Sequence, residues 1–350
     1  MDMRSRERVK AALDGKVTDR VPHNFRAWGN VLDLLGEALQ LPDREAVLRW
    51  SGSDIRDLGG LSSFLKPGAQ LDAGSDIWGV RRETRTGEQG SYAHIAYSPL
   101  ADARDMDDVR SYSFPDAAEL FDFSDLADQA QAVGRNGEYF LFMEVESVFD
   151  RTWAVRGMEN LLMDLITNEN MARYMIEQNA IFFHERTRML LEAGDGMIDC
   201  VGFFNDFGTQ EGLLISPEMY RSFVKPYEME LARLAHEHGA KVFYHSCGCV
   251  SELYPEFLDI GVDIIDPLQL PALKMTPRQL REEFPEANLH GGLDTQHILP
   301  FGTSEEIEAE AHALVRELGR HGHYIVSTSH NIQGGIPVEN LCAMVEALRH

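Results

Sequence analysis

Length, composition and charge limit what kind of protein this sequence describes. The chain has 350 residues, of which 44% are hydrophobic and 25% charged, as in globular proteins with a sizeable core. Its 57 acidic and 32 basic residues give a formal net charge of −25, so we expect neither nucleic acid nor anionic membranes as partners. The first residues lack the apolar core of a signal peptide, and no stretch approaches 18 consecutive apolar residues, which predicts a cytoplasmic protein.

The chain changes character at about residue 138. Before it, residues 20–22 are expected to lead into the first strand, and the Gly- and Asp-rich stretch 51–116 to hold irregular loops and a hairpin. After it, short apolar runs alternate with amphipathic helical patterns. The predicted strands are 138–145, 197–204, 240–244, 262–265, 288–291 and 323–327, and the predicted helices between them include 217–238, 276–284 and 304–321.

Local signals mark where several of these helices begin and end. Ser216 and Thr303 each precede a helical pattern with acidic residues in its first turn, as N-capping hydroxyls do. Gly239, Gly261 and Gly322 each stand between a predicted helix and the next strand. Helices commonly end at such a position with a glycine in the left-handed conformation.

Strand–helix alternation over more than 200 residues predicts a parallel sheet, either closed or open. No Gly-rich phosphate loop follows an early strand, which disfavours an open nucleotide-binding sheet. The strands instead end in polar residues, as expected of a barrel with its site at one rim. We therefore predict a single-domain α/β protein over residues 1–350, a (β/α)₈ TIM barrel with an N-terminal extension and loop insertions.

His245 and Cys247 form the sharpest chemical pattern. Residues i and i+2 of a strand point the same way, so both side chains project from the end of strand 240–244. Imidazole and thiolate at this spacing make a half-site for Zn²⁺. The alternative is a buried histidine and a buried cysteine that happen to be neighbours, but the position at a strand end favours a metal site.

The remaining metal ligands are left open by the sequence. Cys249 is expected to face the following helix, and Cys342 lies in an apolar helical pattern and is expected in the core. His330, which ends the last strand, is ranked first as third ligand. The carboxylates of Glu144 and Asp206, at two other strand ends, are ranked after it.

Other polar residues follow the strands and are candidates for catalysis or substrate binding. Asn205 and Asp206 follow strand 197–204, where Asp206 is placed to orient a substrate, take a proton or bind metal; an ordinary Asx-turn is the alternative. Asp266 is expected to brace its loop. The candidate catalytic residues are Asp206, Glu144 and Asn205, and the candidate substrate-binding residues are Arg26, Gln210, Asp294, Gln296 and Asn331.

Taken together, these motifs resemble the uroporphyrinogen decarboxylase superfamily and, within it, the cobalamin-dependent methyltransferase branch. The resemblance covers nearly the whole chain and is strongest from residue 197 onward. The supporting segments are 6–8, 19–22, 205–210, 216–217, 245–248, 292–296 with 299–300, 329–333 and 337–340.

The resemblance implies a (β/α)₈ barrel and a choice of activities. True uroporphyrinogen decarboxylases follow the first strand with an Arg- and Gln-containing segment that holds the propionates, whereas segment 22–29 keeps only Arg26.

The methyltransferase branch binds zinc through His, Cys and a second Cys near the last strand. His245 and Cys247 match the first two ligands, but the last strand offers His330 in place of a Cys. Fewer thiolates leave the metal more electrophilic, which suits Lewis-acid activation of an ether.

The sequence therefore predicts a zinc-dependent methyltransferase that moves a methyl group between a small methylated compound and cobalamin on a separate corrinoid protein. A metal-free lyase of the decarboxylase type is the alternative, with Asp206 or His245 stabilising a protonated intermediate and Arg26 binding a substrate carboxylate. A catalytically silent binding protein is a third alternative. The oligomeric state, a homodimer included, is left open.

Overall fold

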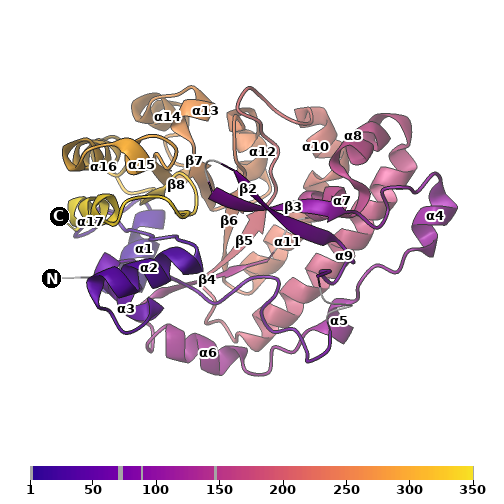
Figure 1. The fold of residues 1–350 in the computed structure, drawn as a ribbon, viewed down its shortest axis with the longest axis horizontal. Coiled ribbons are helices and arrows are strands. Elements are labelled where there is room, and N and C mark those ends of the chain that lie inside the picture. The colour runs from indigo at the N-terminus through magenta and orange to yellow at the C-terminus, as the bar shows by residue number, and fades with distance from the viewer. Residues whose placement is uncertain (1–2, 70–73, 88–89, 146–147, 350) are drawn as a thin grey trace.

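A curled parallel sheet forms the centre of the molecule (Figure 1). The computed structural model describes residues 3–69, 74–87, 90–145 and 148–349. Within these residues the sheet has seven strands in the order β1-β4-β5-β6-β7-β8-β9, all paired in parallel. The strands are β1 Ile55–Asp57, β4 Phe140–Glu144, β5 Cys200–Phe204, β6 Lys241–His245, β7 Ile264–Leu268, β8 Asn288–Leu293 and β9 Tyr324–Thr328.

The expected first strand is reduced to a short segment between β9 and β1. His23 forms an isolated parallel bridge with Val326, and its carbonyl accepts a hydrogen bond of 2.8 Å from the Asp54 amide. Pro22 has no N–H to donate, and the His23 amide binds the Asp54 side chain at 2.9 Å. These two residues therefore interrupt a regular ladder, and the sheet that the described residues form contains seven of the eight strands of the predicted barrel.

Helices cover the outer face of the sheet, and the first and last helices, α1 and α17, lie on the same side of the molecule (Figure 1). Among the described residues, no helix is both long and apolar enough to cross a membrane. The helices are α1 Ser5–Leu13, α2 Gly29–Leu39, α3 Arg44–Ser51, α4 Met106–Ser111, α5 Ala117–Leu120, α6 Leu126–Val133, α7 Val148–Arg156, α8 Met158–Thr167, α9 Glu169–Ala193, α10 Pro217–Phe223, α11 Lys225–Glu237, α12 Tyr254–Asp259, α13 Leu270–Leu273, α14 Pro277–Glu283, α15 Ile298–Phe301, α16 Ser304–Leu318 and α17 Val338–Leu348, with a 3₁₀ turn at Ser251–Leu253.

The six strands predicted after residue 138 are all present, with ends shifted by a few residues. The N-caps at Ser216 and Thr303 are confirmed, because each hydroxyl accepts an amide of the first turn. The predicted helix 217–238 is split at Val224, since Pro226 in the first turn of α11 cannot donate to the preceding helix. The short strand β1 was not predicted.

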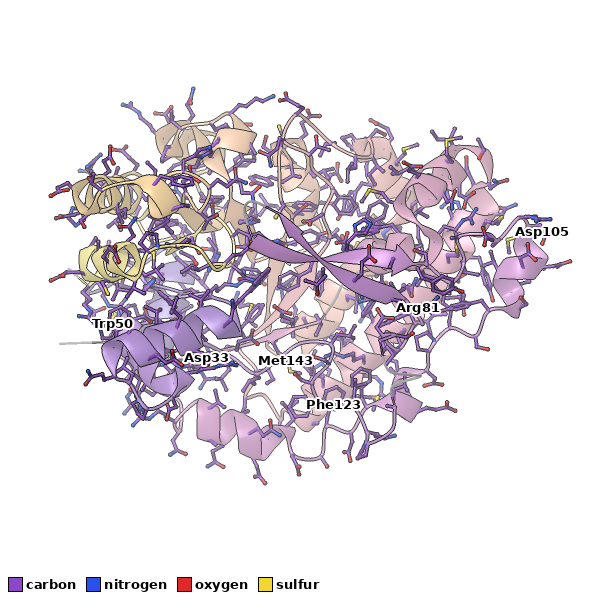
Figure 2. The ribbon with its side chains drawn as sticks, in the orientation of Figure 1. Asp33, Trp50, Arg81, Asp105, Phe123 and Met143 are labelled. Carbon is purple, nitrogen blue, oxygen red and sulfur yellow. The ribbon has the colours of Figure 1, made fainter. Side chains whose placement is uncertain are left out.

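The predicted hairpin is also present, as the two-stranded antiparallel ribbon β2 Arg81–Gly87 and β3 Gly90–Tyr97. The Arg81 guanidinium lies 4.4 Å from the ring centre of Tyr97 on the partner strand. Figure 2 labels Arg81 on this ribbon, which is separate from the central sheet.

Side chains of the strands alternate between two apolar cores. On β4, Leu141 and Met143 belong to the large core under the helices, whereas Phe140 and Phe142 belong to a smaller core inside the curl of the sheet. Figure 2 labels Met143 at the centre of the molecule. This inner core consists of Val9, Leu13, Ile55, Phe140, Phe142, Cys200, Phe243, Ile264 and Ile325. Because it fills the interior, polar side chains can gather only at the strand ends above it.

The junction between segment 22–24 and β1 depends on a buried carboxylate. Asp54 is fully buried and binds the guanidinium groups of Arg8 at 2.6 Å and Arg20 at 2.7 Å. It also accepts the His23 amide. Removing this acceptor takes one of the two carboxylate partners from the buried guanidinium of Arg8, which then keeps only Asp19 at 2.7 Å, and leaves the buried His23 amide without its acceptor.

Replacing Asp54 by Ala should therefore lower the free energy of unfolding by about 3–5 kcal/mol, the cost of breaking a buried ion pair. Urea unfolding at pH 7 measures it. Asp33→Ala, which removes an exposed partner of Arg44 (Figure 2), is the control and should leave the transition unchanged. Equal effects of the two substitutions would contradict a special role for Asp54.

Candidate metal centre

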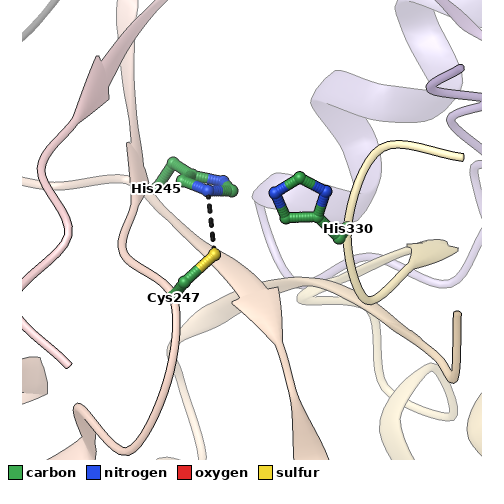
Figure 3. Close-up of side chains that lie close together, drawn as sticks. All are labelled: His245, Cys247 and His330. Carbon is green, nitrogen blue, oxygen red and sulfur yellow. Dashed lines mark hydrogen bonds between the residues drawn. The ribbon is translucent and has the colours of Figure 1, made fainter. Parts of the chain in front are cut away.

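His245, Cys247 and His330 come together at the carboxyl ends of the strands. The Nε2 atom of His245 lies 3.3 Å from Cys247 Sγ, and one ligand atom from each of the three residues lies within 4.8 Å of the other two. His245 ends β6 and is 8% exposed, whereas Cys247 and His330 are half-buried in the segments after β6 and β9. In Figure 3, His330 faces His245 and Cys247 from the other side of the site.

The carboxylate of Asp266 orients the His245 ring. The sheet register places Asp266 of β7 beside His245 of β6, and Asp266 Oδ2 lies 2.5 Å from His245 Nδ1. An ionised carboxylate only accepts hydrogen bonds, so Nδ1 carries the proton. The Nε2 atom faces Cys247 and His330. Burial acts to lower the pKa of His245, but the Cys247 and Asp266 side chains raise it well above its usual range, so a metal ion at Nε2 would displace a proton.

Asp266 holds two further groups besides His245. Its Oδ1 atom lies 2.5 Å from Nδ1 of His290 on β8, and its Oδ2 atom 3.1 Å from Nη1 of Arg26. His290 is completely buried, and its other ring nitrogen meets the Asn24 amide at 3.0 Å. Asp266 thereby ties β6, β7, β8 and the segment after His23 into one polar layer above the inner core.

Burial and neighbouring charges set the protonation of this layer. Burial disfavours ionisation of Asp266, but His290, Arg26 and the hydrogen bond from His245 outweigh it and hold its pKa well below the usual range. Burial lowers the pKa of His330, and the nearby His245 lowers it further. Burial also lowers the pKa of His290. A neutral His330 has a free lone pair, which a metal ligand requires.

Cys247 stands in a loop whose backbone is held from two sides. Its amide donates a hydrogen bond of 2.9 Å to Asp206 Oδ1, and the Gly248 amide donates one of 2.8 Å to Gln269 Oε1. Gly248 has a φ of +89°, and a Cβ atom there would lie 2.6 Å from the Thr209 carbonyl oxygen. Only glycine fits this turn, which directs the Cys247 thiol toward His245.

Asn205 is buried with both ends of its amide engaged. Its Nδ2 atom donates to Glu228 Oε1 at 2.5 Å, and its Oδ1 atom accepts the Phe149 amide at 2.9 Å. Glu228 is 1% exposed and also accepts the hydroxyls of Tyr244 at 2.6 Å and Tyr220 at 2.7 Å. Burial raises the pKa of Glu228 to about 7, although these three hydrogen bonds act against the shift.

The other residues selected from the sequence lie around this group. Asp294 caps its own loop through the Gln296 amide at 2.6 Å. The Gln210 and Gln296 side chains are exposed. Asn331 lies next to His330, and its carbonyl accepts from the His330 ring at 3.4 Å. Among the residues that the structure describes, the metal-ligand group contains none of Glu144, Asp206, Cys249 and Cys342.

Sequence reasoning missed the residues that orient the site. Asp266 was expected only to brace its loop, whereas it binds His245 and His290. His290 and Glu228 were not selected. Two signals in the sequence could have pointed to them. Asp266 is a charged residue directly after the predicted strand 262–265, and His290 is a lone histidine inside the predicted strand 288–291.

Comparison with known proteins identifies relatives of this chain. The profile of the family described as uroporphyrinogen decarboxylase (URO-D) matches residues 90–350, which confirms the resemblance inferred from the motifs. A methylated-thiol–coenzyme M methyltransferase of Methanosarcina mazei is 33% identical over 136 residues, 39% of this chain and 34% of that protein. A uroporphyrinogen decarboxylase of Anaeromyxobacter sp. is 28% identical over 126 residues, 36% of this chain and 34% of that protein. The alignments span about a third of the length of these curated relatives.

A solved structure extends the comparison to the whole chain. A methyltransferase from Methanosarcina mazei superposes with a TM-score of 0.72 and covers 99% of both chains. The two sequences are 16% identical in this superposition, so the likeness concerns the fold.

The raised pKa of Glu228 predicts a specific pH dependence of stability. Between about pH 4.5 and 7 the folded protein retains a proton that the unfolded chain releases, so the contribution of Glu228 is present below pH 4.5 and is lost as the pH rises to 7. The difference in unfolding free energy between the wild type and Glu228→Gln should fall by about 3 kcal/mol from pH 4.5 to 7.5. Urea unfolding at both pH values measures this difference.

Glu256→Gln is the control for this measurement. Lys225 and Arg221 hold the pKa of Glu256 below its usual range. The contribution of Glu256 to the free energy of unfolding should therefore not fall as the pH rises from 4.5 to 7.5. A difference between wild type and Glu228→Gln that does not change with pH would contradict the protonation assigned to Glu228.

Proposed function

We propose that this chain, which belongs to the uroporphyrinogen decarboxylase family, is a zinc-dependent methyltransferase. It moves a methyl group between a small methylated compound, such as a methyl ether, and a separate corrinoid protein. The observation that carries the proposal is the convergence of His245, Cys247 and His330, whose ligand atoms lie within 4.8 Å of one another. The printed activity of the relative from Methanosarcina mazei, methyl transfer, supports the reaction class.

The donor set and its spacing fit zinc. Two imidazole nitrogens and one thiolate are among the ligands that zinc prefers, and in a tetrahedral site a nitrogen and a sulfur ligand lie about 3.5 Å apart. The His245 Nε2 to Cys247 Sγ distance is 3.3 Å. Three protein ligands leave a fourth position for a substrate, as in catalytic rather than structural zinc sites.

The residues of the chain prepare this site for a cation. Asp266 holds the proton of His245 on Nδ1, so that Nε2 is the donor atom. Asp206 and Gln269 fix the loop of Cys247 through backbone amides. A bound zinc ion would supply a Lewis acid that polarises the heteroatom carrying the methyl group.

The ligand composition favours a methyl ether over a thiol as substrate. One thiolate and two neutral imidazoles give the site less negative charge than two thiolates and one imidazole, so the metal withdraws more electron density from its fourth ligand. In the proposed reaction the carbon–heteroatom bond would break, a cob(I)alamin carried by the partner protein would accept the methyl group with its own electron pair, and the leaving heteroatom would keep the bonding pair and take up a proton. Asp206 and Glu144 are the carboxylates proposed to handle that proton.

The remaining proposed roles follow from position. Arg26 contacts Asp266 and lies over the rings of Phe204 and Phe243, 5.7 and 5.4 Å from their centres, where it can bind a polar substrate group. The contacts of Asn205 make it a positioning residue. Gln210, Asp294, Gln296 and Asn331, in the loops after β5, β8 and β9, are proposed to contact the substrate or the corrinoid protein.

We also propose that segment 22–24 acts as the eighth strand of a closed barrel, so that residues 1–350 form one domain. The parallel bridge of His23 to β9 and its hydrogen bond to Asp54 before β1 support this closure. A thiolate ligand is retained best in a reducing compartment, which agrees with a cytoplasmic location.

A metal-free decarboxylase is the second candidate, favoured by the relative from Anaeromyxobacter. It would use Arg26 to bind a substrate carboxylate. Arg26, however, already donates to Asp266 at 3.1 Å, which offsets part of its charge. Chelation separates the two candidates, since a decarboxylase of this type would keep its activity without metal.

Purified without chelators, the protein should contain about one zinc per chain, and Cys247→Ala or His330→Ala should remove most of it. Elemental analysis measures the metal content. Cys342→Ala is the matched control, because Cys342 lies on α17 outside the ligand group and should leave zinc unchanged. Full zinc occupancy in Cys247→Ala would exclude that thiol from the site.

Asp206→Asn tests the carboxylate chemistry. The substituted amide oxygen can still accept the Cys247 amide, so the loop is kept while the charge is removed. The rate of methyl transfer from a methyl ether to cob(I)alamin, followed by cobalamin absorbance, should fall by about 10²-fold with an unchanged melting temperature. A variant that melts earlier and keeps its rate would show that Asp206 only braces the loop.

A further inference from the structure

Glu228 is a buried carboxyl group for which the proposed reaction has no use. It lies on α11, and its three hydrogen-bond donors come from α10, β6 and the segment after β5. Burying a carboxyl group costs free energy even when it is hydrogen-bonded. Two of its donors are tyrosines that no proposed step involves, whereas the third, Asn205, leads to the candidate metal centre.

Asn205 begins a segment that is bonded to the metal-binding loop at three successive points. The Asn205 amide donates to the His245 carbonyl at 3.1 Å. The Phe207 amide donates to Ser246 Oγ at 3.1 Å, and the Cys247 amide donates to Asp206 Oδ1 at 2.9 Å. The position of segment 205–207 therefore determines where the backbone of both His245 and Cys247 lies.

The same segment is also attached to the start of α7. Asn205 Oδ1 accepts the amides of Phe149 and Asp150 at 2.9 and 3.1 Å, and Asp150 Oδ1 accepts the Asp206 amide at 3.0 Å. These bonds require the oxygen of the Asn205 side chain to face α7 and its nitrogen to face Glu228.

Glu228 fixes this orientation of Asn205. If the amide rotated by half a turn, its NH₂ group would face the two N–H groups of α7, and its oxygen would face the Glu228 carboxyl oxygen. The facing N–H donors at α7 exclude that arrangement, and repulsion between the two oxygens adds to this when Glu228 is ionised. Without an acceptor at position 228, the NH₂ group of Asn205 would keep only its long contact of 3.4 Å with the Tyr244 hydroxyl, which would itself lose its acceptor, and the segment would be free to shift.

We propose that Glu228 is a positioning residue for the metal centre, holding Asn205 so that segment 205–207 keeps His245 and Cys247 in register for a divalent cation. The inference rests on the proposed function, because it presumes that His245, Cys247 and His330 bind metal. Glu228 itself lies outside the ligand group, on helix α11.

Zinc affinity tests the role, measured by competition with a chromophoric chelator on the full-length protein. Glu228→Leu removes the acceptor of Asn205 and should weaken zinc binding by about 10-fold, the lower end of the effect of losing a direct partner of a metal ligand, because Glu228 acts through Asn205. Glu228→Gln keeps an oxygen facing Asn205 and should restore binding to within about 3-fold of the wild type.

Tyr220→Phe is the matched control. Tyr220 donates to the other carboxyl oxygen of Glu228, away from Asn205, so its loss should lower the melting temperature and leave the zinc affinity within about 3-fold of the wild type. Should Glu228→Leu not accumulate as folded protein, Asn205→Ala interrupts the same connection from the other end and should weaken zinc binding similarly.

The outcomes separate this inference from the proposed function. A Glu228→Leu or Asn205→Ala protein that melts earlier but binds zinc as tightly as the wild type overturns the positioning role and leaves the metal site intact. A wild type that binds no zinc overturns the proposed function and the positioning role with it. Weakened binding in Glu228→Leu that Glu228→Gln restores supports the inference.

Discussion

The carboxylate of Asp266 is the interaction on which the candidate site depends. It lies above the inner core and binds the rings of His245 and His290 and the guanidinium of Arg26, which come from three different parts of the chain. A single buried anion shared by three potential cations keeps its charge, and it fixes which nitrogen of His245 is available. The orientation of the His245 ring is therefore set by the buried Asp266 carboxylate, and the surface loops do not determine it.

The fold supplies the place for this arrangement. Parallel strands bring their carboxyl ends to one rim, and alternation along each strand divides apolar side chains between the two cores. His245, at the end of β6, stacks on Phe204 at the end of β5, with ring centres 5.1 Å apart. His330 reaches the site from the segment after β9 because the curled sheet brings β9 across from β6. Residues 85 positions apart in the chain are thereby within reach of one cation.

Much of this could be predicted from the sequence because the responsible signals are local. The strands after residue 138 are apolar runs with capped helices between them, and the spacing of His245 and Cys247 follows from strand geometry. His330 was chosen because it ends the last strand, and it meets the other two residues. The reduced first strand was not predictable, since it depends on the Asp54 side chain replacing a backbone partner at His23. The orienting roles of Asp266 and Glu228 depend on pairings across strands and helices, which no spacing in the sequence encodes.

Zinc K-edge X-ray absorption of the purified protein tests the central claim most directly, because it reports the atoms bound to the metal. The account predicts one sulfur at about 2.3 Å and two imidazole nitrogens at about 2.0–2.1 Å, with a light atom in the fourth position. The sulfur contribution should disappear in Cys247→Ala. A first shell with two sulfurs, or with oxygen and nitrogen alone, would contradict the ligand set of His245, Cys247 and His330.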